Sequence, residues 1–138
     1  MPEYLDIKDV ISQLGGNDKV KAALKSNLNW IVKSFEANKE HRGSSGKRTV
    51  YGQWGTAYPE TTGYMIPTLL ECQSYDKRLK DIALAQLSYF ESIQNEDGSF
   101  YQSSSNRTPI IFDTAQIVLG LLVLAPNIVP YKLSLIHI

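Results

Sequence analysis

The sequence predicts an all-α fold made of helical hairpins. Two segments carry apolar residues every three or four positions, which is the stripe of an amphipathic helix, and two others are apolar on almost every side. The two kinds of segment alternate along the chain. The length of 138 residues, with 43% hydrophobic and 20% charged residues, suits one globular domain and not a disordered chain.

The first predicted hairpin spans about residues 18–74. It opens with an amphipathic helix over residues 18–38, which Asn17 or Asp18 can cap because a side-chain oxygen there accepts a free backbone N–H. The apolar stripe of this helix is formed by Val20, Ala23, Leu24, Leu28, Ile31, Val32 and Phe35. A second helix over residues 61–74 is apolar nearly all round, so we expect it to be buried on most sides.

The second predicted hairpin spans about residues 76–125. Its amphipathic helix covers residues 76–94 and ends where Gly98 can take a left-handed turn. The stripe of this helix is formed by Leu79, Ile82, Ala83, Leu87, Phe90 and Ile93. A loop over residues 103–114 leads into the fourth helix, residues 113–125, which is apolar all round like the second.

The two hairpins align as copies of one unit. The amphipathic helices match at an offset of 59 residues, which pairs Val20 with Leu79. The apolar helices match at an offset of 52, which pairs Thr62 with Thr114, so the first copy has a loop longer by 59 − 52 = 7 residues. Identities are few, and coincident amphipathic periodicity is the alternative. Hairpins of this kind stack side by side, and two of them do not close a core.

Composition argues against several classes of function. Fourteen basic and fourteen acidic side chains give a net charge of zero, so no bulk field draws the chain to nucleic acid or an anionic membrane. A single Cys, with His41 and His137 as the two His residues, argues against a disulfide framework or a metal centre. We expect no cofactor, and we interpret Cys72 as a packing residue. The first residues show no secretory signal, and the longest apolar run, residues 117–126, is too short for a membrane span, so a cytoplasmic location is expected.

The last six residues, 133–138, are interpreted separately. They read LSLIHI and continue no periodic pattern. The transposon-end adapter used in sequencing libraries, CTGTCTCTTATACACATC, encodes the same string in one frame. We therefore expect residues 133–138 to be a non-native tail and the native protein to continue beyond about Lys132, which leaves residues 1–132 as a partial domain. An ordinary apolar tail is the alternative.

Three strings carry a resemblance to a known family. They are YPETTGYMIPTLL (residues 58–70), QNEDGSF (94–100) and IFDTAQIVLGLL (111–122). Together they resemble a bacterial family of α/α-toroid proteins with prenyltransferase/squalene-oxidase-like repeats, found among exopolysaccharide-biosynthesis proteins. QNEDGSF also fits the Q-x3-G-x-(W/F) repeat signature of terpenoid-cyclase-type toroids. The resemblance covers about residues 30–125.

The resemblance implies an (α/α)6 toroid, similar to six-hairpin glycosidases, of which this chain would hold about two hairpins. The apolar helices would be inner helices that line a central cavity. The loops over residues 48–62 and 103–114 would lie on one rim of that cavity, where ligands bind. A glycan or another small molecule would be the ligand, and other polysaccharide-biosynthesis proteins are the partners that the family suggests.

Glu60 and Asp113 are the candidate catalytic residues, because each lies close to the start of an apolar helix. Two carboxylates facing one cavity are what general acid/base attack on a glycosidic bond, or proton abstraction beside a uronate, requires. A hydrolase, a lyase and an epimerase all fit this pattern. Capping is the alternative: Asp113 before Thr114 makes a good N-cap, and the helix macrodipole favours Glu60 near a helix start.

Candidate substrate-binding residues gather around these carboxylates. Sugar rings stack on aromatic faces, and hydroxyl, amide and guanidinium groups bind sugar hydroxyls or acidic substituents. The candidates are Arg48, Trp54, Tyr58, Thr61, Tyr64 and Gln116. For the aromatic residues the alternative is packing between hairpins, and for Arg48 it is a surface ion pair.

Two other functions compete with a glycan-binding or glycan-processing protein. A terpenoid or prenyl enzyme needs an Asp-rich acid, a diphosphate–Mg²⁺ site or a zinc set, and the sequence shows no Asp-rich run. A non-catalytic helical-repeat scaffold would bind a partner across its inner surface. Substitution of Glu60 or Asp113 would leave such a scaffold functional.

Overall fold

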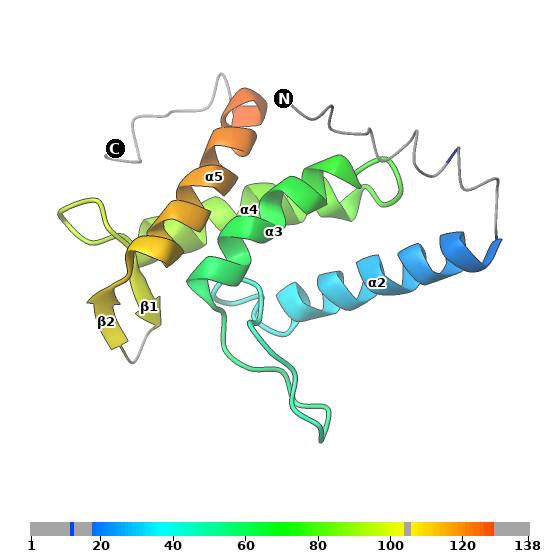
Figure 1. Cartoon of the computed structure of the whole chain (residues 1–138), viewed down its shortest axis with the longest axis horizontal. Helices are drawn as coiled ribbons and strands as arrows, with labels where there is room; N and C mark the ends of the chain where they lie inside the picture. The colour runs from blue at the N-terminus through cyan, green and yellow to red at the C-terminus, as the bar shows by residue number, and fades with distance from the viewer. Residues whose placement is uncertain (1–11, 13–17, 104–105, 129–138) are drawn as a thin grey trace.

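The computed structural model describes Ser12, residues 18–103 and residues 106–128 (Figure 1). This part of the chain is mainly helical, as predicted. Its elements are α2 (Asp18–Glu36), α3 (Pro59–Glu71), α4 (Arg78–Ile93), β1 (Tyr101–Ser103), β2 (Asn106–Pro109) and α5 (Ile111–Ile128). No helix in these ranges is long and apolar enough to span a membrane. The expected non-native tail, residues 133–138, lies outside the described residues.

The four helices lie where the apolar patterns predict them, but two begin early. α3 begins at Pro59, two residues before the predicted start, because a proline in the first helical position loses no hydrogen bond and already has a helical φ. α5 begins at Ile111, also two residues early, and continues through Pro126. Gly98 has a φ of 85°, so it takes the left-handed turn expected after α4.

A small β-hairpin replaces part of the loop predicted over residues 103–114. β1 and β2 pair antiparallel, with Tyr101 opposite Pro109 and Ser103 opposite Asn106. Strands of three and four residues are too short to show the alternation from which a strand is predicted. The sequence therefore predicted a loop where the structure has a short β-hairpin followed by the start of α5.

α3 and α5 cross in close contact (Figure 1). A β-carbon added at Gly63 would lie 2.7 Å from the Cα of Ile117, and one added at Gly120 would meet the carbonyl oxygen of Gly63. Only backbones without side chains approach so closely, so both glycines are needed at the crossing. The core around the crossing includes the fully buried side chains of Ile66, Leu69, Leu79, Phe90, Phe100, Ile117 and Leu124.

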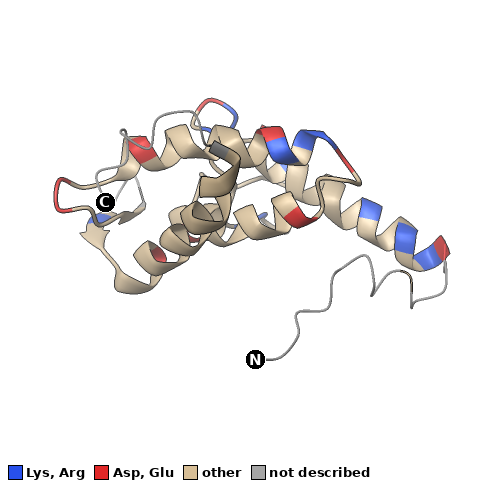
Figure 2. Cartoon of the chain, turned by 90° about the horizontal axis from the view of Figure 1, so that it is seen from above, with Lys and Arg blue, Asp and Glu red and all other residues tan. Residues whose placement is uncertain are grey.

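The amphipathic and apolar helices differ in how they meet solvent. α2 buries Leu28, Val32 and Phe35 from its predicted stripe, and its lysines are exposed to solvent (Figure 2). α5 is apolar all round but not buried on all sides, because Leu119 and Leu122 are 53% and 65% exposed, and this agrees with the expectation that two hairpins do not close a core. The described part of the chain covers only one side of α5.

The long loop between α2 and α3, residues 37–58, has a fixed base. Asn38 Nδ2 donates hydrogen bonds to Ser45 Oγ and, at 3.1 Å, to the carbonyl oxygen of Gly55. The Ser45 hydroxyl donates to the same carbonyl at 2.6 Å, and a β-bridge pairs Ser45 with Ala57. The two arms of the loop are therefore joined at their base, and the tip of the loop projects away from the helices (Figure 1).

Candidate active site

Glu60 and Asp113 lie in the first turns of α3 and α5. Glu60 is the second residue of α3 and Asp113 is the third residue of α5, so the positive end of a helix dipole favours each carboxylate. Asp113 is not an N-cap, contrary to the capping interpretation, because α5 already begins at Ile111. In the repeat, the exact counterpart of Asp113 is Thr61, which is the third residue of α3.

The helix crossing brings these two first turns together. Gly63 lies against the backbone of Gln116 and Ile117. Glu60 precedes Gly63 by three residues, and Asp113 precedes Gln116 by three, so each carboxylate lies about one turn before the crossing. Burial raises the pKa of Glu60, and the nearby charge of Asp113 raises it further. The predicted pair is therefore close enough for the two charges to interact.

Asp113 is the more deeply buried member of the pair. Its exposed fraction is 4%, and its Oδ2 has no hydrogen-bond partner among the described residues. Burial raises the pKa of this carboxyl as well. Glu60 is half-buried and reaches solvent. An unpaired buried carboxylate lowers stability, and groups of this kind with a shifted pKa concentrate at functional sites.

Four candidate substrate-binding residues lie around the same two turns. Thr61 is buried, Tyr58 and Gln116 are half-buried, and Tyr64 is exposed on α3. The Tyr58 hydroxyl accepts a hydrogen bond from Gln102 Nε2 at 3.3 Å. This bond joins Tyr58, the residue before α3, to Gln102 of strand β1.

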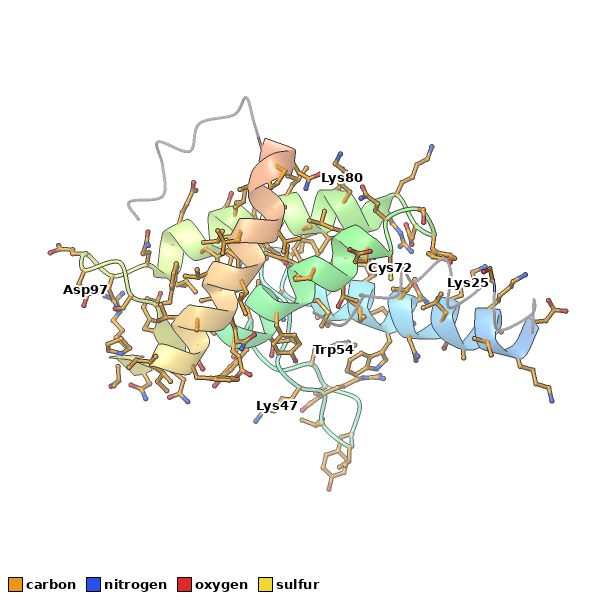
Figure 3. The ribbon with its side chains drawn as sticks, turned by 45° about the horizontal axis from the view of Figure 1, so that its top comes forward. Lys25, Lys47, Trp54, Cys72, Lys80 and Asp97 are labelled. Carbon is orange, nitrogen blue, oxygen red and sulfur yellow. The ribbon has the colours of Figure 1, made fainter. Side chains whose placement is uncertain are left out.

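Trp54 lies elsewhere, against Trp30 of α2 (Figure 3), and Arg48 lies on Trp54. The Trp54 ring packs on the Trp30 ring with 4.9 Å between centroids, and the Arg48 guanidinium lies 5.3 Å from the centre of the Trp54 ring. Arg48 Nε also donates to the carbonyl oxygen of Gly52 at 3.0 Å. Among the described residues, no hydrogen bond, ion pair or ring contact joins Trp54 or Arg48 to the carboxylates. Trp54 therefore holds the loop onto α2, and Arg48 packs within the loop.

A buried polar cluster that the sequence analysis missed positions the start of α3. Gln86 of α4 is fully buried and donates from Nε2 to Ser44 Oγ at 2.9 Å. The Ser44 N–H donates to Thr62 Oγ1 at 3.0 Å, and the Thr62 hydroxyl donates to the carbonyl oxygen of Tyr58 at 2.7 Å. The sequence does hold a sign of this cluster: Gln86 interrupts the apolar stripe of α4, and a buried polar side chain there needs a hydrogen-bond partner.

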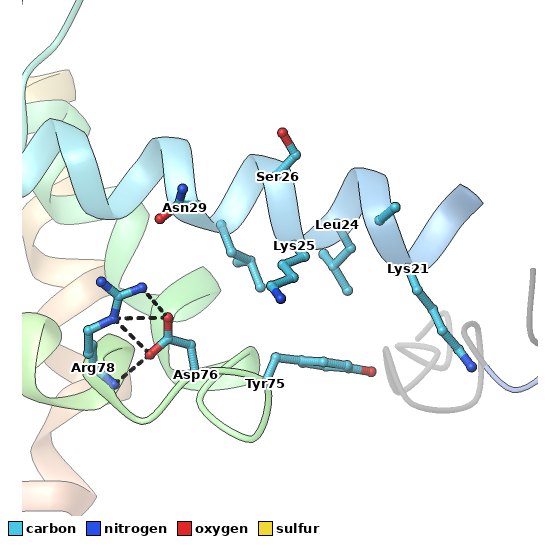
Figure 4. A pocket seen from close by; sticks show the side chains of 10 residues that line it. Lys21, Leu24, Lys25, Ser26, Asn29, Tyr75, Asp76 and Arg78 are labelled. Atoms are coloured by element: carbon cyan, nitrogen blue, oxygen red, sulfur yellow. Dashed lines mark hydrogen bonds and ion pairs between the residues drawn. The ribbon is translucent and has the colours of Figure 1, made fainter. Parts of the chain in front are cut away.

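Two cavities on the described surface lie at different places relative to the carboxylate pair. One of about 680 Å³ lies between α2 and the turn before α4, remote from the pair (Figure 4). In it, Arg78 Nη2 lies 2.7 Å from Asp76, and this hydrogen-bonded partner lowers the pKa of Asp76. A shallower depression of about 380 Å³ is lined in part by Ile111 and Thr114, the neighbours of Asp113 in α5. Neither carboxylate and none of the candidate substrate-binding residues lines this depression.

The remaining candidates for chemistry do not form a site. Among the residues that the structure describes, no group of three His, Cys, Asp or Glu side chains could hold a metal ion. Cys72 is buried at the end of α3, as predicted, and burial raises the pKa of its thiol (Figure 3). A raised pKa keeps the thiol protonated, which is unlike an activated nucleophile.

No family model, curated protein or solved structure matches the chain. The first turns of α3 and α5, with Glu60 and Asp113, carry the chemistry that bears on function. A half-buried carboxyl with a raised pKa, next to a second and deeper carboxyl, can exchange a proton with a ligand.

Proposed function

We propose that the protein is a carbohydrate-active or polysaccharide-biosynthesis protein of the α/α-toroid type that binds a glycan beside the first turns of α3 and α5. The carboxylate pair of Glu60 and Asp113 carries this proposal. Two matching hairpins with close-packed apolar helices, and the resemblance of residues 58–70 to the toroid family, support it. Tyr58, Tyr64 and the amide of Gln116 supply further groups that suit sugar hydroxyls and ring faces.

Glu60 is the residue that exchanges a proton with the glycan in this proposal, because it is the member of the pair that reaches solvent. Asp113 lies deeper, and its charge favours the protonated form of Glu60. A carboxyl with a raised pKa donates a proton to a leaving oxygen, or regains one, more readily near neutral pH. Hydrolysis, elimination beside a uronate and epimerisation all use such a step.

Isothermal titration with neutral and uronic-acid oligosaccharides tests the proposal. We expect binding to the unmodified chain. Glu60→Gln is expected to abolish turnover or to weaken binding at least about tenfold, a change of about 1.4 kcal/mol. Glu71→Gln is the matched control, because Glu71 is an exposed glutamate at the other end of α3. Circular dichroism of both variants confirms that the fold is retained.

The same titrations separate the proposal from its alternatives. Binding of an isoprenoid diphosphate in place of any sugar would favour a terpenoid or prenyl enzyme. A function that survives both Glu60→Gln and Asp113→Asn would favour a scaffold. No heat with any oligosaccharide at millimolar concentration would contradict the proposal.

A further inference from the structure

The carboxylate pair at the first turns of α3 and α5 is not offset by a positive charge. Burial and the charge of Asp113 raise the pKa of Glu60, and burial raises the pKa of Asp113. A lysine or arginine beside either carboxylate would lower that pKa, and none does so among the residues that the structure describes. The described part of the site is therefore acidic.

The arginines that precede the two turns in the sequence are engaged elsewhere. Arg48 lies 5.3 Å from the centre of the Trp54 ring and donates to the carbonyl oxygen of Gly52 at 3.0 Å. Arg107 lies over the Tyr101 ring, 5.4 Å from its centre. Arg48 is the residue that the sequence predicts for an acidic substituent of the ligand. The structure places this guanidinium on Trp54, so it does not stand beside the carboxylates to hold such a substituent.

One oxygen of the pair is buried without a partner. Asp113 is 4% exposed, and the described residues give its Oδ2 no hydrogen bond. A buried carboxylate oxygen ordinarily accepts a hydrogen bond or faces a cation, because water no longer stabilises its charge. Glu60 is half-buried and its charge interacts with that of Asp113. A ligand that contacts Glu60 therefore also lies in the field of Asp113.

The uncharged groups around the pair suit a sugar and supply no positive charge. Tyr58 and Tyr64 offer ring faces and hydroxyl groups, and Gln116 offers an amide. These three side chains are neutral near pH 7. A positive charge on the ligand would supply what these neighbours lack.

We infer that the glycan is an amino sugar with a free primary ammonium group, and not a neutral sugar or a uronic acid. The inference rests on the proposed function, because it selects one class among the glycans that this function allows. The ammonium donates a charge-assisted hydrogen bond to Glu60 and offsets the repulsion between Glu60 and Asp113. A uronic acid brings a third carboxylate to the same place, where both residues repel it.

Isothermal titration with three tetrasaccharides tests the inference. They are β-1,4-linked glucosamine, β-1,4-linked glucose and a galacturonate, used at about pH 6.5, where an amine is protonated. Glucosamine and glucose differ by an amino group in place of one hydroxyl, so their shapes are matched. We expect the glucosamine form to bind at least about tenfold more tightly than the glucose form. The galacturonate is expected to bind most weakly.

Variants of the chain locate the preference for the amine. Glu60→Gln keeps the size of the side chain and removes its charge, so it is expected to bring the glucosamine and glucose affinities within about threefold. Asp113→Asn is expected to reduce the preference by a smaller factor, because Asp113 is buried and acts through its field. Glu71→Gln, at the exposed far end of α3, is the matched control and is expected to keep the full preference. Circular dichroism confirms that each variant is folded.

The outcomes separate this inference from the proposed function. Equal affinity for the glucosamine and glucose forms, tighter binding of the galacturonate, or a preference that survives Glu60→Gln would overturn the inference and leave the glycan proposal standing. Absence of binding by all three tetrasaccharides would overturn the proposed function itself, and the inference with it.

Discussion

Thr62 and Thr114 make the same hydrogen bond in the two hairpins. The hydroxyl oxygen of Thr62 accepts the backbone N–H of Ser44 at 3.0 Å, and that of Thr114 accepts the backbone N–H of Phe100 at 3.2 Å. Each threonine is the fourth residue of its helix, and each bond ties a first turn to the segment before it. The two threonines, which the offset of 52 residues aligns, therefore play the same part in their hairpins, although their donors lie 56 residues apart.

Replacing either threonine by valine is expected to destabilise the fold. Valine keeps the shape of the side chain but leaves a backbone N–H without its partner, which costs about 1 kcal/mol. The loss is expected to be larger for Thr62→Val, because Thr62 is fully buried and its hydroxyl also donates to Tyr58. Urea unfolding followed by circular dichroism measures both. An equal or smaller loss at Thr62 would contradict the assigned network.

The crossing of α3 and α5 is expected to tolerate no side chain at its two glycines. Gly63→Ala and Gly120→Ala would each place a β-carbon against backbone atoms that cannot rotate away. We expect each change to lower the free energy of unfolding by about 2 kcal/mol. Thr68→Ala on the exposed side of α3 is the control, with a change within about 0.5 kcal/mol. Thermal unfolding curves that place all three variants together would contradict this description of the crossing.

Asp113→Asn is expected to stabilise the protein at neutral pH while impairing its function. Burial raises the pKa of Asp113, so the ionised form is destabilising above that pKa, and the cost disappears when the carboxyl is protonated. The variant is expected to gain about 1 kcal/mol at pH 7. The gain is expected to vanish below about pH 3.8, the ordinary value for an aspartate. Unfolding measured across this pH range checks the sign, and a variant less stable than the parent at pH 7 would rule out an unpaired carboxylate.

Trp30 and Trp54 are expected to stabilise each other. Their rings lie 4.9 Å apart, and aromatic pairs of this geometry contribute about 0.5–1.5 kcal/mol beyond their burial. A double-mutant cycle with Trp30→Ala and Trp54→Ala measures the coupling. Because the pair holds the long loop onto α2, oligosaccharide binding at Glu60 is expected to persist in Trp54→Ala. Additive effects of the two substitutions would show that the contact contributes nothing.

The sequence identified most of the fold because its signal is local. The stripes of α2 and α4 follow from the periodicity of residues such as Leu28 and Leu79, and Gly98 follows from the need for a left-handed turn. The β-hairpin was not predicted because strands of three and four residues are too short for an alternation of apolar and polar residues to stand out. The partners of Gln86 also escaped, because Ser44 lies 42 residues away and periodicity carries no information about distant contacts.

The candidate site, like the fold, could be predicted from the sequence only in part. The sequence by itself determined that acidic residues, Glu60 and Asp113, stand near the starts of two apolar helices, because helix starts have a local chemical signature. Only the tertiary structure decided that these starts meet, since the meeting depends on a crossing at Gly63 and Gly120. The structure also separated Trp54 from the carboxylates and left Leu122 exposed, because each depends on which surfaces pack together and not on the residues nearby in the chain.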